Sequence, residues 1–150
     1  MFDENGNLPP GFHDWSLSEI KENLVKNFSS DSNRGKLFSG YCRLRDEMIS
    51  IDLQFEHWID GSFCTQKIKP NDIDMLSIIP AENIEKLNST EKNKLVSCVN
   101  GPISKEQYCC DSYMLAAVPE NHPNYQLFHK MHMYWYGEFG LDRPALSRYY

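Results

Sequence analysis

One stretch of the sequence, residues 58–79, constrains the fold most, because it predicts two strands joined by a tight turn and a loop. It reads Trp-Ile-Asp-Gly-Ser-Phe-Cys-Thr-Gln-Lys-Ile-Lys-Pro-Asn-Asp-Ile-Asp-Met-Leu-Ser-Ile-Ile. Residues 55–60 predict a short strand, and Gly61-Ser62 then turns the chain. The apolar run that follows predicts a buried strand over residues 72–79, with two aspartates at its leading end.

Asp72 and Asp74 lie eleven and thirteen residues after Gly61. Side chains alternate faces along a strand, so both carboxylates are predicted to point the same way, with Ile73 behind them. Two carboxylates spaced about 7 Å along one face can hold a divalent cation or bridge a pair of them. An Asp-x-Asp pair alone is common. Behind a Gly-Ser turn at this distance, it indicates metal-assisted phosphoryl or nucleotidyl transfer.

The Gly61-Ser62 turn is a candidate phosphate-binding element. Glycine lets the backbone approach a phosphate closely, and Ser62 offers a hydroxyl and an N–H group to phosphate oxygens. An ordinary turn is the alternative for this pair. Lys67 and Lys69 follow in the loop, where each either neutralises triphosphate charge or is a solvated lysine. Arg34 is a weaker candidate for the same role.

A third acid, Asp111, lies inside the strand predicted over residues 108–118. With Asp72 and Asp74 it would complete a three-carboxylate cluster suited to two magnesium ions. A solvent-facing position on an edge strand is the alternative, but aspartate disfavours strands and usually needs a reason to be there. Asp60, beside the turn, is predicted to cap it.

The rest of the chain is organised by helical periodicity and by chain breakers. One clear amphipathic helix is predicted by the spacing of Leu37, Tyr41, Leu44, Met48 and Ile51. The other predicted elements are an ordered N-terminal arm over residues 1–15, a first helix capped by Ser16 and Glu19 and ending near Phe28, one or two helices over residues 81–99 with a break at 88–90, a turn at 100–102, and a last helix from Pro123 to about Phe139 capped by Gly140. This order predicts a single α/β (α+β) domain over residues 1–150, with a small sheet covered by helices.

Composition narrows the classes of function. The chain has 150 residues, 41% of them hydrophobic, which suits one globular domain. A net charge of -6 argues against a protein that coats duplex DNA or anionic membrane. The sequence shows neither a transmembrane run nor a signal peptide, so a cytoplasmic protein that does not act on a membrane is predicted. The five cysteines lack a C-x-x-C pair and are predicted to be reduced, mostly buried thiols; a zinc site assembled from scattered residues is the alternative.

The Gly61-Ser62 turn, the Asp72-x-Asp74 pair and the later Asp111 resemble the motif of the DNA polymerase β-type nucleotidyltransferase superfamily. Within it, the chain is similar to the minimal, MNT-type members. Residues 2–11 and 61–67 also resemble a small uncharacterised group of bacterial and phage-defence-associated proteins of that superfamily.

This resemblance implies a mixed β-sheet flanked by helices and a transfer dependent on Mg²⁺ (or Mn²⁺). A nucleoside or deoxynucleoside monophosphate would pass from a triphosphate, ATP or dATP, to a hydroxyl acceptor, with pyrophosphate released. Asp72 and Asp74 would be the shared metal ligands, and Asp111 the third acid, which helps to deprotonate the acceptor. Many minimal members carry an arginine soon after Gly-Ser, whereas this chain has Lys67. There is also no second helical domain to grip base and acceptor.

The resemblance further implies an acceptor that is a partner protein encoded alongside, an RNA end or a short oligonucleotide, in a toxin-antitoxin or anti-phage system. Two other functions stay open. One is a catalytically silent, antitoxin-like interaction module that binds and neutralises a partner protein. The other is a metal-dependent phosphohydrolase or an unrelated α/β protein. The aromatic last helix would either pack into the core or form a homo-oligomer or partner surface.

Overall fold

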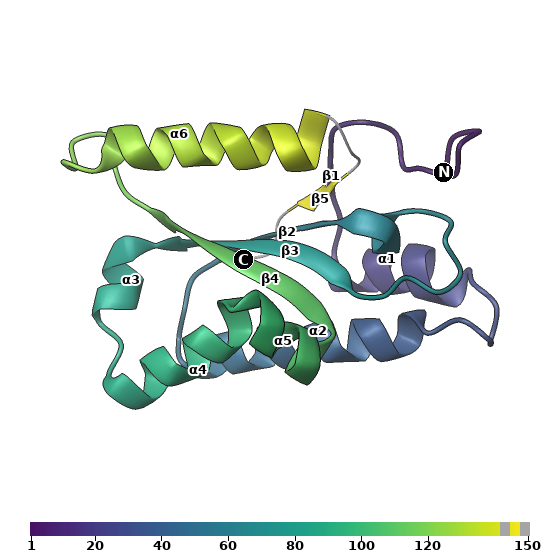
Figure 1. Cartoon of the computed structure of the whole chain (residues 1–150), viewed down its shortest axis with the longest axis horizontal. Coiled ribbons are helices and arrows are strands. Elements are labelled where there is room, and N and C mark those ends of the chain that lie inside the picture. Colours follow the sequence, from purple (N-terminus) through teal and green to yellow (C-terminus); the bar gives the residue numbers. More distant parts are fainter. Residues whose placement is uncertain (142–144, 148–150) are drawn as a thin grey trace.

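The computed structural model describes residues 1–141 and 145–147 and has the predicted α+β architecture (Figure 1). A mixed sheet has the strand order β1-β5-β2-β3-β4, so β1 and β4 are its edge strands. β2 runs antiparallel to both β3 and β5, whereas β3 and β4 are parallel, as are β1 and β5. The strands are β1 (Phe12–Asp14), β2 (Glu56–Asp60), β3 (Ile73–Pro80), β4 (Cys110–Ala117) and β5 (Ala145–Ser147).

Helices cover both faces of this sheet, but unequally. α6 lies alone across one face, while α1, α2, α4 and α5 lie on the other side (Figure 1). The helical elements are α1 (Leu17–Lys21), η1 (Glu22–Lys26), α2 (Arg34–Ser50), η2 (Gly61–Cys64), α3 (Ala81–Glu85), α4 (Ser89–Val99), α5 (Gly101–Tyr108), α6 (Tyr125–Tyr136) and η3 (Gly137–Leu141).

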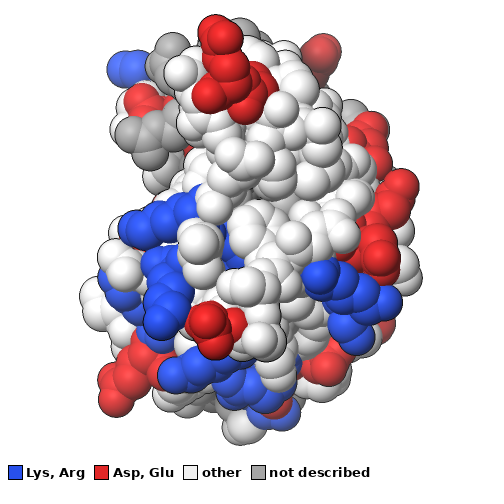
Figure 2. All heavy atoms as spheres, turned by 90° about the vertical axis from the view of Figure 1, so that its right-hand side faces the viewer, with Lys and Arg blue, Asp and Glu red and all other residues white. Residues whose placement is uncertain are grey.

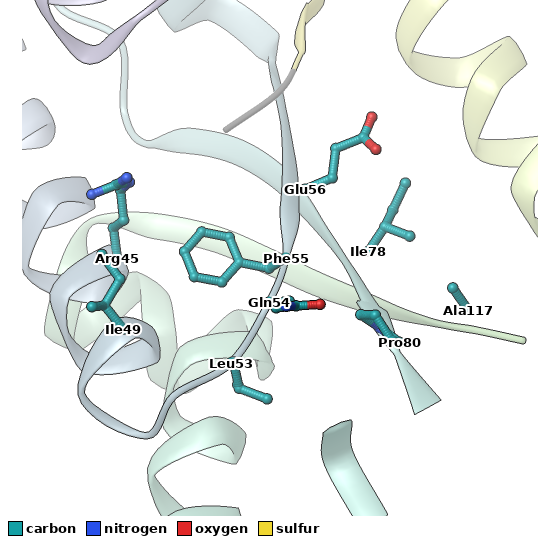
Figure 3. Close-up of a pocket in the computed structure, with 9 residues that line it drawn as sticks. All are labelled: Arg45, Ile49, Leu53, Gln54, Phe55, Glu56, Ile78, Pro80 and Ala117. Carbon is teal, nitrogen blue, oxygen red and sulfur yellow. The ribbon is translucent and has the colours of Figure 1, made fainter. Parts of the chain in front are cut away.

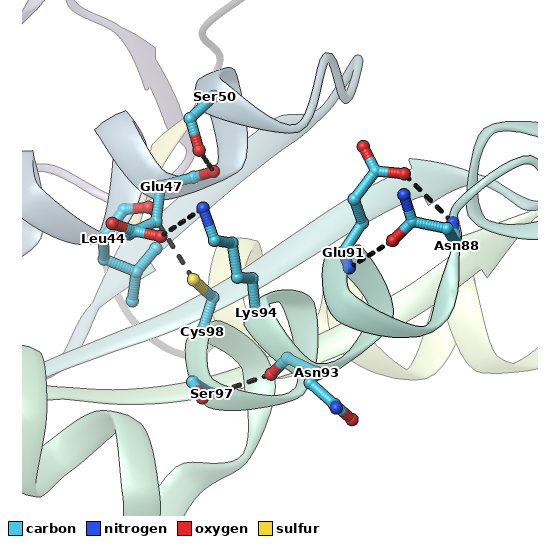
Figure 4. Close-up of polar contacts among 9 residues, drawn as sticks. All are labelled: Leu44, Glu47, Ser50, Asn88, Glu91, Asn93, Lys94, Ser97 and Cys98. Atoms are coloured by element: carbon cyan, nitrogen blue, oxygen red, sulfur yellow. Dashed lines mark hydrogen bonds and ion pairs between the residues drawn. The ribbon is translucent and has the colours of Figure 1, made fainter.

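The α2 face holds the main core. All five apolar residues whose spacing predicts this helix are buried, which confirms the prediction. α4 packs beside α2, where the Cys98 thiol contacts the Leu44 carbonyl and Lys94 pairs with Glu47 at 3.9 Å (Figure 4). Burial raises the pKa of Cys98 to about 12, so this thiol is neutral at physiological pH. All five cysteines are free thiols.

The α6 face holds a smaller cluster, made of Trp58, Leu76, Ile78, Leu115 and Phe139. Side chains of α6 pack against it only partly, and none of the residues of that helix is fully buried. Four large apolar side chains of α6 stay exposed: Leu127, Met133, Tyr134 and Tyr136. The helix therefore rests on the sheet without being embedded in it.

The N-terminal arm lies against the body of the protein. Leu8 is buried, and the backbone N–H of Gln66 donates a hydrogen bond of 2.8 Å to the Gly6 carbonyl. Asn7 and Thr65 form an isolated antiparallel bridge in the same place. The arm thus supports the loop that follows η2.

The capping signal at the start of α1 is confirmed. Ser16 and Glu19 form the predicted reciprocal capping box of α1. The break predicted at residues 88–90 lies slightly earlier, between the end of α3 and the start of α4, because Ser89 and Thr90 already belong to α4. Asn88 with Glu91 forms a capping box at the start of α4, which was not predicted (Figure 4). Gly140 lies inside η3 and does not cap α6. Within the residues that the structure describes, no helix is long and apolar enough to cross a membrane.

The segment before β4 differs from the prediction. Residues 100–102, predicted as a turn, begin the helix α5, because proline is tolerated in the first turn of a helix, where the N–H has no intrahelical partner. Tyr108 therefore ends a helix, and the strand starts at Cys110. Cys109 between them takes a left-handed conformation with φ of 58°. α5 packs closely on α2, since a Cβ on Gly40 would overlap the Tyr108 carbonyl.

Candidate functional site

Three aspartates form a row across the adjacent strands β2, β3 and β4, hereafter the acid row. Asp60 at the end of β2 is the register partner of Asp74 in β3, and Asp74 is the partner of Asp111 in β4. Directly opposed residues of neighbouring strands share a face, so the three carboxylates belong to the face that α6 covers. Asp60 is 5% exposed, and the other two are half-buried. The predicted cap is wrong, because the Asp60 side chain does not cap η2.

Gly61 presses the turn against this row. Its φ of +77° is a conformation that other residues rarely adopt. A Cβ at this position would also overlap the Asp74 carboxylate. Both facts require glycine, and they bring the backbone of Gly61-Ser62 directly beside the acid row. Ser62 is half-buried in η2 and lies next in the chain.

Arg34 holds the loop that follows. Its guanidinium is fully buried and donates to backbone carbonyls of Leu24, Phe63, Thr65 and Lys67 at 2.6 to 3.1 Å. It also lies 3.7 Å from the centre of the Phe28 ring. Burial lowers the pKa of Arg34 to about 10, which leaves it charged at neutral pH. The structure thus places Arg34 beneath the loop as a support.

Lys67 and Lys69 are exposed on the loop between η2 and β3. They are not among the residues that line the cavity at the acid row. Figure 2 shows this end of the molecule, the right-hand side of Figure 1: lysine and arginine side chains gather on the left and lower parts of the view, and acidic side chains line its right edge. Lys67 and Lys69 are thus exposed lysines that follow the Gly61-Ser62 turn in the chain.

Asp72 lies immediately before β3, not within it. Its carboxylate pairs with Lys105 of α5, with 2.8 Å between Oδ2 and Nζ. The pKa of Lys105 is raised, first by the hydrogen bond to Asp72 and then by the charges of Asp72, Asp111 and Asp74. Among the described residues, no three His, Cys, Asp or Glu side chains lie together in a way that could hold a metal ion. In this conformation Lys105 is the ion-pair partner of Asp72 in place of a metal ion.

The first turn of α5 contacts the third acid. A Cβ on Gly101 would lie 2.7 Å from Oδ1 of Asp111 and 3.1 Å from the Tyr113 hydroxyl. The Asp111 charge raises the pKa of Tyr113, whose ring stacks on Trp135 of α6 at 6.0 Å. The positive end of the helix dipole thus faces the Asp111 carboxylate.

A cavity of about 180 Å³ opens between the acid row and the end of α6. It has an acidic floor and an aromatic wall, and its lining is Asp60, Asp74, Met75, Asp111, Tyr113, Trp135, Glu138 and Phe139. Ligand sites for whole small molecules are usually about 300 to 1,000 Å³. This cavity therefore suits the reacting part of a ligand, with the remainder lying over the surface.

A larger cavity of about 700 Å³ lies near the opposite end of β3 (Figure 3). Its lining is mainly apolar, and the residues are Arg45, Ile49, Leu53, Gln54, Phe55, Glu56, Ile78, Pro80 and Ala117. Glu56 already accepts a hydrogen bond from the Trp58 indole at 2.7 Å. None of the residues singled out from the sequence as catalytic or phosphate-binding lines this cavity, so the acid row is the better candidate for chemistry.

Some residues of the site carry no sequence signal of their own. Asp60 joins the acid row only through strand register, which the sequence does not display. Lys105 lies in α5, a helix that was not predicted because its first residues, Gly101 and Pro102, are typical of a turn. Alternation along a strand starting at Asp111 would have placed Tyr113 on the same face, so that residue could have been found.

Comparison with known families gives one result. Residues 1–148 match a family of unknown function, DUF6932, and the chain belongs to that family. Neither the curated proteins nor the solved structures include a significant match.

Proposed function

We propose that this DUF6932 chain is a metal-dependent nucleotidyltransferase, which moves a nucleoside or deoxynucleoside monophosphate from a triphosphate to a hydroxyl acceptor. The acid row carries the proposal: Asp60, Asp74 and Asp111 stand in register on three adjacent strands, with Gly61 packed on the central carboxylate. Carboxylate oxygens are the ligands that Mg²⁺ takes in proteins, usually together with substrate phosphates. A glycine turn beside them allows those phosphates to approach.

The chemistry of the donor set fits a divalent cation. Asp72, Asp74 and Asp111 would hold Mg²⁺ or Mn²⁺, which supplies charge neutralisation and a lowered pKa for the acceptor hydroxyl. Asp111 would accept the proton of that hydroxyl. Asp72 has first to leave Lys105, its partner in the present conformation.

Other residues of the chain would bind the nucleotide. Backbone and hydroxyl of Gly61-Ser62 would contact phosphate oxygens, and Lys67 and Lys69 would screen the remaining charge. The Tyr113 ring, 44% exposed and stacked on Trp135, offers an aromatic wall on which a base can lie. Because aromatic stacking does not distinguish bases strongly, ATP or dATP as the donor rests on the resemblance alone.

The acceptor would be a partner protein, an RNA end or a growing oligonucleotide, in a toxin-antitoxin or anti-phage system. This part of the proposal rests on the resemblance to minimal nucleotidyltransferases. The exposed apolar side chains of α6 add a physical reason to expect a macromolecular partner or a second copy of the chain, because they leave hydrophobic surface in water.

A second function is favoured by one observation. The ion pair between Lys105 and Asp72 neutralises an acid that catalysis would need. A catalytically silent module that binds a partner protein would keep such a pair permanently. Under this alternative, partner binding would survive loss of the acid row.

The deciding experiment incubates the purified protein with each labelled nucleoside and deoxynucleoside triphosphate plus Mg²⁺ or Mn²⁺. Asp74→Asn is expected to reduce transfer by about a hundredfold or more, as loss of a central charge-stabilising group does, without lowering the apo melting temperature. The exposed Asp46 of α2 supplies the control, since Asp46→Asn should transfer normally.

Gly61→Ala should also abolish transfer, because its Cβ would displace the Asp74 carboxylate. Gly137→Ala is the matched control, since nothing lies within 4 Å of a Cβ there. Full transfer by Asp74→Asn would contradict the proposal. Release of phosphate without pyrophosphate would identify a phosphohydrolase, and silence of the wild type with all substrates would favour the binding module.

A further inference from the structure

Lys105 forms an ion pair with Asp72, one of the acids proposed to hold the metal. Its ammonium lies 2.8 Å from Asp72, and the charges of Asp111 and Asp74 also act on it. The Asp72 side chain is 14% exposed while that of Lys105 is 53% exposed, so the carboxylate is the enclosed partner and the lysine borders solvent.

We infer that Lys105 stands in for the divalent cation: it occupies Asp72 in the metal-free protein and must release it before a metal can bind. The inference rests on the proposed function, because it concerns the same carboxylates. Four aspartates at one end of a sheet repel one another, and an ammonium among them relieves that repulsion. The same ammonium competes with any divalent cation for the oxygens of Asp72.

The competition explains a feature of the site that is otherwise contradictory. The acids stand in register, yet in the described residues no group of three is arranged to hold a metal. With Asp72 drawn to α5, the set is incomplete until the lysine leaves. A metal that arrives with a triphosphate would ease this exchange, because the phosphates offer the displaced ammonium a new anionic partner.

The test is direct binding of Mn²⁺ to the apo protein, followed by electron paramagnetic resonance, without any nucleotide. Lys105→Met should bind Mn²⁺ about fivefold more tightly than the wild type, the size expected when a half-exposed ion pair no longer competes. Its metal-free melting temperature should fall, because the acids repel, and Mn²⁺ should raise it by more than in the wild type. Lys105→Arg keeps the pair and should behave as the wild type does.

Lys94 provides the matched control. It is similarly exposed and pairs with Glu47 at 3.9 Å on α2, away from the acids, so Lys94→Met should leave Mn²⁺ affinity unchanged. If Lys105 only fastened α5 to β3, Lys105→Met would lower the melting temperature with no gain in Mn²⁺ affinity. That result would overturn the inference and leave the metal site standing. Asp74→Asn should abolish Mn²⁺ binding in both the wild-type and the Lys105→Met background. If no protein binds Mn²⁺ in a way that Asp74→Asn abolishes, the proposed function and the inference are both overturned.

Discussion

The two faces of the sheet are packed to different depths. On the α2 face, Tyr41, Leu44 and Met48 are completely buried. On the α6 face, the helix contributes partly buried side chains and leaves Leu127 63% exposed. The acid row lies on this second face, beneath the C-terminal end of α6. The α2 face therefore holds more of the buried core than the α6 face does.

Leu44→Ala should cause the largest loss of stability, about 3 kcal/mol in the free energy of unfolding, because it leaves a cavity in a fully buried site. Urea titration followed by circular dichroism measures it. A loss below about 1 kcal/mol, which is the scale of a surface substitution, would mean that the α2 face does not carry the core.

Acid should weaken the same face through His57. This residue is fully buried, with Nδ1 3.0 Å from the Tyr41 hydroxyl and its ring stacked on Phe55. Burial lowers the pKa of His57 from 6.5 to about 3. Between these two pH values His57 is protonated in the unfolded chain but neutral in the folded protein. The contribution of His57 to the free energy of unfolding is therefore fully present above pH 6.5 and is lost as the pH drops toward 3.

The expected loss from His57 is about 2 kcal/mol between pH 8 and pH 5. Thermal unfolding over this range, compared with His57→Asn, isolates it. The variant keeps a polar group near Tyr41 but has no titrating ring, so its stability should fall less steeply with acid. Equal slopes in the two proteins would show that other groups set the pH dependence.

The smallest effects are expected on α6. Met131→Ala should cost about 1 kcal/mol, since the side chain is only partly buried. Leu127→Ser, at an exposed position, should stay within about 0.5 kcal/mol. Chemical denaturation of both variants checks these values. A loss for Met131→Ala as large as that for Leu44→Ala would erase the difference between the two faces.

Prediction from sequence succeeded where the signal was local. The spacing of apolar residues in α2 and the capping pair of α1 depend on residues close together in the chain, so the sequence displays them directly. The strands β2 and β3 are long enough to show apolar runs bounded by glycine and proline, and both lie within two residues of where they were expected.

What depends on distant partners could not be predicted. β1 and β5 have three residues each; among the described strands β1 pairs only with β5, and β5 also pairs with β2. The start of α5 reads as a turn because asparagine, glycine and proline favour both a turn and the first turn of a helix. At the site, two of the acids were evident from their spacing, whereas the place of Asp60 depends on register and that of Lys105 on a helix of ambiguous sequence.

The strand order also bears on how the chain assembles as it is made. β5 stands between β1 and β2, so Phe12–Asp14, translated early, has no neighbouring strand until Ala145–Ser147 emerges from the ribosome. Pairings between segments so far apart in sequence form late and slowly. The three strands of the acid row, by contrast, follow one another along the chain. A nascent protein can therefore pair the three strands of its acid row while one edge of its sheet is still unbuilt.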